Sequence, residues 1–224
     1  MSLKKLFLCG VPVFMALTLN ACIGASMDIS IRADGSGKIA LEYRVPQMME
    51  SLGKLDGNER WPLIPVGRAD FERGLARIPG LSLSSFSVKE NVPGGALGGR
   101  DYVVRAVVEF RNTDALLAFL DSTGSRAFLV READPAKAAN LLRLTLLDPS
   151  AETADADLLS LLREVSGEYR IDISLTAPSA ASLTVIPASV TSARTVTGGK
   201  KVSFSIATGE LLSLSGGLAL EIAW

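Results

Sequence analysis

Two neighbouring stretches near the start of the chain alternate between apolar and polar residues. In residues 27–33 every second side chain is apolar, and residues 38–45 repeat this pattern. The sequence Asp-Gly-Ser-Gly at residues 34–37 joins them, and glycine readily adopts the positive φ that tight turns need. The pattern predicts a β-hairpin with one buried face and one polar face.

Similar patterns predict further strands along the chain. In residues 81–89 the apolar phase changes between Leu83 and Phe86, which predicts a β-bulge. Residues 102–110 carry apolar side chains on both faces, which favours a central strand or a second covering layer. The other predicted strands are residues 126–131, 142–146, 169–175, 182–186, 193–196, 201–206 and 218–224.

Helical spacing occurs between these strands. Residues 69–78 carry Phe71, Leu75 and Ile78 at i, i+4 and i+7, and we expect Thr113 to cap a second helix. Further helical segments are predicted at residues 46–52, after Asp134 and at residues 154–165.

This order of elements predicts an α+β fold. We expect a largely antiparallel β-sheet with a few packed helices and a strand-rich C-terminal third. We interpret residues 27–224 as a single domain. The alternative is that the strands after Gly167 form a separate small sheet.

The first residues have the pattern of a secretory leader. Lys4 and Lys5 precede an almost wholly apolar run at residues 6–19, too short for the roughly 20 residues of a membrane-spanning helix. The run ends in Leu19-Asn20-Ala21-Cys22, which resembles the lipobox of bacterial lipoproteins. The alternative is a chance cysteine after a signal, or a buried apolar helix.

The lipobox resemblance implies that residues 1–21 are a cleaved signal peptide and that Cys22 carries a thioether-linked diacylglycerol. Residues 22–26 are then the lipidated cysteine and a short tether. The protein is expected in the bacterial cell envelope, held by acyl chains such as palmitate, with its domain facing the periplasm or the exterior. Several acyl chains hold a protein at a membrane much better than one.

Composition restricts the chemistry that the chain can perform. It has 23 basic and 24 acidic residues, and removing the two leader lysines leaves 21 basic ones, a net charge of −3. This balance gives no indication of nucleic-acid binding. The chain contains no histidine, and its two cysteines are Cys9, in the leader, and Cys22. Histidine-based catalytic triads and histidine zinc sites are therefore excluded, and we expect no cofactor, metal or disulfide.

A few sequence motifs are candidates for a catalytic or ligand-binding site. Ser51 and Lys54 have the Ser-x-x-Lys spacing of penicillin-recognising enzymes, but the further elements of that family do not occur. Residues 94–100 are rich in glycine but lack the Gly-Lys-Ser/Thr of a phosphate loop. Asp148, Glu152, Asp155 and Asp157 form an acidic cluster that lacks the spacing of a calcium-binding loop. We interpret these residues as the acidic start of a helix, where carboxylates interact favourably with the helix dipole. Hydrolysis by a pair of carboxylates stays open.

An apolar segment with two prolines forms another candidate site. Trp61, Leu63 and Ile64 lie between or beside Pro62 and Pro65, which prevent regular strand pairing. One interpretation is a loop that packs onto the core. The other is a rim for a ligand or the membrane, since tryptophan favours boundaries between water and apolar surroundings.

Several segments together resemble the LppM-type domain of envelope lipoproteins. They are the turn Ala33-Asp34-Gly35-Ser36-Gly37, the pair Val45-Pro46, Phe110 with the helix at Thr113, and Ile171-x-Ile173-x-Leu175-x-Ala177-Pro178. The resemblance implies an α+β domain without known catalytic residues that binds an envelope lipid or glycolipid.

Three functional hypotheses follow. The first is a non-enzymatic, lipid-anchored protein that binds an amphipathic ligand or a protein partner near the membrane. The second is a structural or assembly factor that acts through protein contacts. The third is a carboxylate hydrolase. An apolar cavity between sheet and helices would favour the first, an exposed apolar patch the second, and a cleft with two carboxylates the third.

Overall fold

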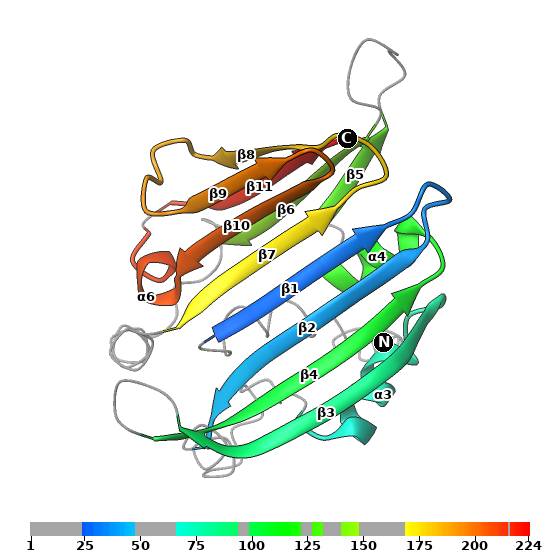
Figure 1. Ribbon diagram of the computed structural model, residues 1–224, viewed down its shortest axis with the longest axis vertical. Helices are drawn as coiled ribbons and strands as arrows, with labels where there is room; N and C mark the ends of the chain where they lie inside the picture. Colours follow the sequence, from blue (N-terminus) through cyan, green and yellow to red (C-terminus); the bar gives the residue numbers. More distant parts are fainter. Residues whose placement is uncertain are drawn as a thin grey trace, which may run out of the picture.

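The computed structural model describes residues 24–47, 66–93, 99–121, 127–131, 140–147, 169–214 and 216–224. These residues form an α+β fold with two sheets (Figure 1). Sheet A has seven strands in the order β3 (Leu81–Pro93), β4 (Arg100–Phe110), β2 (Gly37–Pro46), β1 (Gly24–Ile31), β7 (Arg170–Thr176), β10 (Lys201–Ala207) and β9 (Arg194–Gly198). Sheet B has four, in the order β5 (Ala127–Arg131), β6 (Asn140–Leu147), β11 (Leu218–Ala223) and β8 (Ser182–Ile186). The described helices are α3 (Arg68–Leu75), α4 (Thr113–Leu120) and the single turn α6 (Thr208–Leu211).

The predicted hairpin is confirmed. Strands β1 and β2 pair in antiparallel fashion, and Gly35 in the turn between them has φ +81°. Strand β1 begins at Gly24 rather than at Met27, so residues 24–26, which we expected in the tether, belong to the strand. Apart from the parallel pair β1–β7, all strand pairs in both sheets are antiparallel.

The features predicted for the next two strands are also present. The register between β3 and β4 shifts between Leu83 and Ser85, which is the expected bulge. Strand β4 lies between β3 and β2, and Val103 on its second face is 3% exposed. The apolar residues on both faces of β4 thus reflect a strand inside the sheet rather than at its edge.

The helices differ from prediction in their ends. Helix α3 buries Phe71 and Leu75 but ends before Ile78. In α4 the N-cap is Asn112, whose side-chain oxygen accepts a hydrogen bond of 2.9 Å from the Ala115 N–H. The prediction that Thr113 caps this helix is wrong, because Asn112 has the extended backbone of a cap and Thr113 is the first helical residue. The helical segment predicted at residues 46–52 does not begin at Pro46, because Pro46 is the last residue of β2 and pairs with Asp101. Its residues 48–52 lie outside the described residues, as do the helical segments predicted after Asp134 and at residues 154–165.

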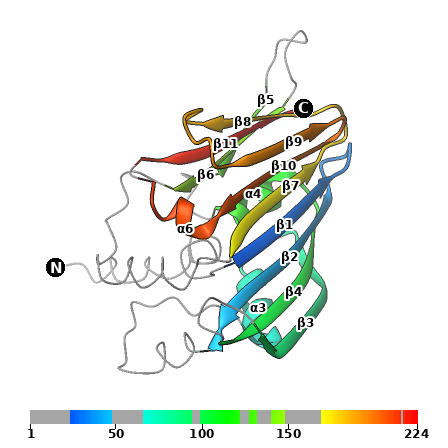
Figure 2. The same ribbon diagram turned by 60° about the vertical axis from the view of Figure 1, so that its left-hand side comes forward.

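The strands after Gly167 do not form a sheet of their own. β7, β10 and β9 complete sheet A, whereas β8 and β11 belong to sheet B. Helix α3 packs on β3, and α4 contacts both β4 of sheet A and β5 of sheet B. Figure 2 shows these helices and sheet B on the same side of sheet A.

One continuous apolar core lies between sheet A, the helices and sheet B. Its largest fully buried side chains come from both sheets and both longer helices: Tyr43, Phe71, Phe204, Ile29, Ile39, Leu116, Leu120, Leu142, Leu144, Ile171, Leu175 and Ile206. Within the described residues, no helix has the length and apolar character needed to cross a bilayer. The opposite face of sheet A, which we call the outer face, is turned toward the viewer in Figure 1.

Candidate functional site

The outer face of sheet A is polar because its strands alternate. In β1, Met27, Ile29 and Ile31 point into the core, so Asp28 and Ser30 point outward and are only partly buried. The same alternation places polar side chains on the outer face of β2, β4, β7 and β10. Strand pairing then sets which of these residues become neighbours.

The strand register arranges the outer side chains in rows that cross the sheet. One row runs through Ser87, Arg105, Glu42, Ser26, Asp172 and Ser205. The next row runs through Ser85, Val107, Ala40, Asp28, Ser174 and Ser203. The first row contains serine hydroxyls and charged groups, whereas the second also contains the apolar side chains of Val107 and Ala40.

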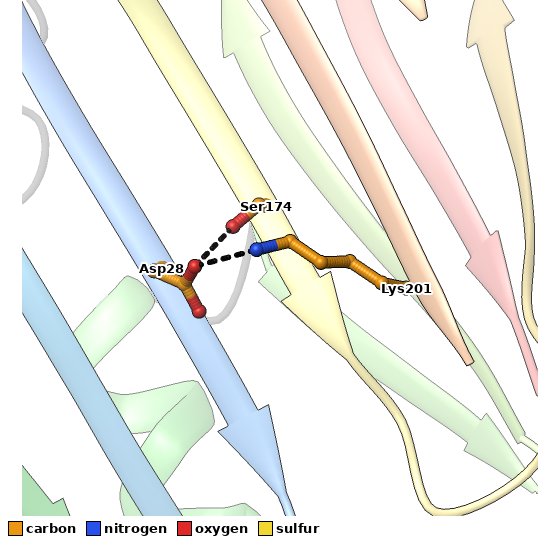
Figure 3. A network of polar contacts seen from close by, with 3 residues as sticks. All are labelled: Asp28, Ser174 and Lys201. Carbon is orange, nitrogen blue, oxygen red and sulfur yellow. Dashed lines mark hydrogen bonds and ion pairs between the residues drawn. The ribbon is translucent and has the colours of Figure 1, made fainter. Parts of the chain in front are cut away.

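The charged groups on these rows are paired across strands. Arg105 Nε donates a hydrogen bond of 2.6 Å to Glu42 Oε2, and the two side chains are 49% and 34% exposed. Asp28 Oδ2 accepts hydrogen bonds from Ser174 Oγ at 2.7 Å and from Lys201 Nζ at 3.0 Å (Figure 3). This second group ties together β1, β7 and β10, including the parallel strand pair.

A further cluster lies on β7 and β10, near the end of the sheet where β1 begins. Ser205 donates a short hydrogen bond to Asp172 and accepts one of 2.9 Å from Arg170 Nε. The serine thus connects a carboxylate with a guanidinium that lies two residues away on the same strand.

The outer face contains a hollow of about 390 Å³. Strands β1, β2, β3 and β4 form it, and the bulge in β3 increases the twist of the sheet at its margin. Its outward-facing side chains are small or polar: Ser26, Asp28, Ala40, Glu42, Ser85, Ser87, Arg105 and Val107. We refer to this feature as the outer hollow. The first hypothesis expected an apolar cavity between the sheet and the helices, on the side of sheet A where the apolar core packs. The outer hollow lies on the opposite side.

Two carboxylates line the outer hollow. Asp28 is opposite Ala40 and Glu42 is opposite Ser26, so the two acids occupy diagonal positions, which lie about 7–8 Å apart in a sheet. This separation is close to that of glycosidase acid pairs, roughly 5–9.5 Å. A glycosidase acid, however, is kept protonated by an apolar pocket. Asp28 and Glu42 are partly exposed and pair with Lys201 and Arg105, an arrangement that suits binding better than acid catalysis.

Ser174 is not arranged as a nucleophile. Its hydroxyl donates to Asp28, and the amine of Lys201, the nearby group that would have to serve as base, forms an ion pair with the same carboxylate. A protonated amine in an ion pair does not accept a proton from serine. We therefore interpret the hydrogen bonds of Asp28 with Ser174 and Lys201 (Figure 3) as a structural connection between strands.

Most of the candidate residues named from the sequence lie outside the described residues. These are the lipobox residues Leu19, Asn20, Ala21 and Cys22, the rim residues Trp61, Leu63 and Ile64, the pair Ser51 and Lys54, residues 94–98 of the glycine-rich loop, and the four acidic residues of the cluster. Among the described residues, no three acidic, histidine or cysteine side chains come close enough to hold a metal ion.

No pattern in the sequence indicated the outer hollow. Alternation alone placed Asp28 on a polar face, but the hollow depends on the register between four strands. The register of β1 with β2 follows from the hairpin turn, whereas that of β3 with β4 includes two shifts. The sequence therefore indicated the polar face of the hairpin but not the diagonal placement of Asp28 and Glu42 in the outer hollow.

Comparison with known proteins leaves the family question open. No protein-family model matches the chain, and no curated protein matches it significantly. The resemblance to the LppM-type domain therefore stays a prediction based on the segments that carry it.

Proposed function

We propose that the protein is a lipid-anchored lipoprotein of the bacterial cell envelope that acts by binding rather than by catalysis. The start of the folded domain carries this proposal. Strand β1 covers Gly24–Ile31 and pairs with β2 from Gly24 onward, so the predicted cleavage point before Cys22 lies two residues before a strand of the central sheet. A chance cysteine at the end of an apolar segment would have no reason to lie directly before the first described strand.

The position of β1 also predicts how the domain meets the membrane. Two residues span at most about 7 Å, so a lipid on Cys22 holds the Gly24 end of the sheet close to the bilayer. β1 is flanked by β2 and β7 inside a seven-stranded sheet, which provides firm attachment for an anchor. The outer hollow begins at Ser26 and is therefore close to the membrane surface as well.

Binding is favoured over catalysis by the groups present. The chain has no histidine, and its cysteine outside the leader is the predicted lipidation site. The carboxylates of the outer hollow are paired with cations and half-exposed. Such groups offer hydrogen bonds to a ligand, which favours recognition of an envelope molecule near the membrane.

The anchor is tested by replacing Cys22. The wild-type protein is expected in the membrane fraction and labelled by an alkyne analogue of palmitate. Cys22→Ser is expected to lose the label and to remain uncleaved. Labelling of the Cys22→Ser variant at wild-type level would refute the anchor.

A structural role through protein contacts is the second candidate. Strand β5 at the edge of sheet B exposes Phe128 at 39% and Val130 at 43%. Arg143 lies over the Phe128 ring at 6.0 Å, which covers this apolar surface only in part. Exposed apolar side chains on an edge strand favour a protein partner. Crosslinking from residue 130 in intact cells tests this role, and the absence of any crosslinked protein would count against it.

A further inference from the structure

We propose that the outer hollow binds an uncharged oligosaccharide. The inference rests on the proposed binding function and names its ligand class and site. The outer hollow has a volume of about 390 Å³, within the roughly 300–1,000 Å³ of small-molecule sites.

The walls of the outer hollow can form hydrogen bonds with a ligand. The hydroxyl groups of Ser26, Ser85 and Ser87 make no hydrogen bond to another described residue. Arg105 uses its Nε toward Glu42, and its Nη groups likewise have no partner among the described residues. Sugar hydroxyls both donate and accept hydrogen bonds, so they match a wall of hydroxyl, guanidinium and carboxylate groups.

The charges around the outer hollow are balanced. Glu42 is paired with Arg105, and Asp28 with Lys201, so the carboxylates and cations around the outer hollow offset each other. An anionic ligand would approach two carboxylates, and a cationic ligand would approach Arg105 and Lys201. In both cases like charges would repel each other. An uncharged ligand with many hydroxyl groups avoids this repulsion and can form hydrogen bonds with both the carboxylates and the cations.

The floor of the outer hollow is apolar. Ala40 and Val107 are direct neighbours on β2 and β4, and they place small apolar side chains between the polar walls. A sugar ring has an apolar C–H face and a hydroxyl edge. The ring face therefore fits over Ala40 and Val107 while its hydroxyls reach the walls.

The position of the outer hollow in the chain agrees with an envelope ligand. Ser26 lies four residues after Cys22, and four residues reach at most about 14 Å. A glycan at the membrane surface is therefore within reach of the anchored domain.

The test is a titration of the lipidated protein in phosphatidylcholine nanodiscs. The ligands are maltotetraose, cellotetraose and chitotetraose, and binding is followed by saturation-transfer difference NMR. We expect saturable binding of at least one tetrasaccharide. Ala40→Phe fills the outer hollow and is expected to lower the affinity about tenfold or more. Ser203→Phe adds the same side chain to the same face outside the outer hollow and should leave the affinity unchanged.

A second variant covers the possibility that Ala40→Phe does not fold. Arg105→Gln removes the guanidinium donors and is also expected to weaken binding. The inference is overturned if no tetrasaccharide binds the wild type, or if Ser203→Phe weakens binding as much as Ala40→Phe does. It is also overturned if a folded Ala40→Phe binds like the wild type.

Nanodiscs that contain digalactosyl diacylglycerol distinguish two sources of the sugar. Weaker tetrasaccharide binding in these discs would indicate that a lipid-borne sugar occupies the same site. Unchanged binding would indicate a free glycan. Failure of all three tetrasaccharides with a protein that carries the palmitate label would refute the sugar site and leave the anchor intact.

Discussion

The hydrogen bond between Tyr169 and Asp101 offers a direct test of how sheet A is held together. The Tyr169 hydroxyl donates to Asp101 Oδ2 at 2.6 Å, and the residues are 6% and 1% exposed. Tyr169 immediately precedes β7, while Asp101 lies near the start of β4, with β1 and β2 between these strands. The Tyr169 ring lies so close to Gly24 that a Cβ there would be 2.8 Å from its Cδ1. The bond therefore joins distant parts of the chain across the start of β1.

Tyr169→Phe removes this hydrogen bond and keeps the ring. A hydrogen bond to a charged group stabilises a protein by about 1.5–3 kcal/mol, and a desolvated carboxylate without its donor is costly. The expected loss in the free energy of unfolding is therefore about 1.5–3 kcal/mol. In the Asp101→Asn background the same change should cost only about 0.5–1.5 kcal/mol, because the remaining bond is between neutral groups.

The effect is measured by urea unfolding of the wild type, the two single variants and the double variant. Tryptophan fluorescence can follow unfolding because Trp224 is 7% exposed and packs in the core. A positive coupling energy between the two sites would support the bond. A loss below about 0.5 kcal/mol for Tyr169→Phe, the range of ordinary surface changes, would refute the reasoning.

Three further predictions concern single positions. Asn112→Ala should destabilise the protein by about 1 kcal/mol through loss of the helix cap, whereas Thr113→Ala should stay within about 0.5 kcal/mol; equal effects in urea unfolding would contradict the assignment. The side-chain hydrogen bond from Ser36, with a backbone one from the same residue, lowers the pKa of Asp34, so Ser36→Ala should raise that pKa in an NMR titration. Because the folded pKa is the lower one, the stabilisation is present at neutral pH and is lost as the pH falls through the acid range; an unchanged pKa would count against it. Trp61→Ala should cost roughly 0.5 kcal/mol if this residue forms a membrane rim, with a blue shift of Trp61 fluorescence on adding vesicles; a loss of about 3–5 kcal/mol without that shift would place it in the core.

Within the described residues, local patterns predicted most of the strands. The hairpin of β1 and β2 and the bulge after Leu83 both follow from the phase of apolar residues along one stretch. The cap of α4 was assigned one residue too late, since Asn112 and Thr113 are both suitable caps and backbone conformation decides between them. These features depend on residues that are close in sequence.

Long-range pairing could not be obtained in the same way. Asp28 and Ser174 are neighbours in the parallel pair β1–β7, although 146 positions separate them. Alternation indicates which face a residue occupies but not which strand lies beside it. The outer hollow depends on this missing information, since it combines side chains from β1, β2, β3 and β4.

The central claim is that the mature protein begins at a lipidated Cys22 directly before β1. Mass spectrometry of the N-terminal peptide from the protein purified from membranes tests it most directly. The account predicts a first residue Cys22 whose sulfur carries diacylglycerol, followed by Ile23 and Gly24. A peptide that begins at another residue, or one with a free Cys22 thiol, would contradict it.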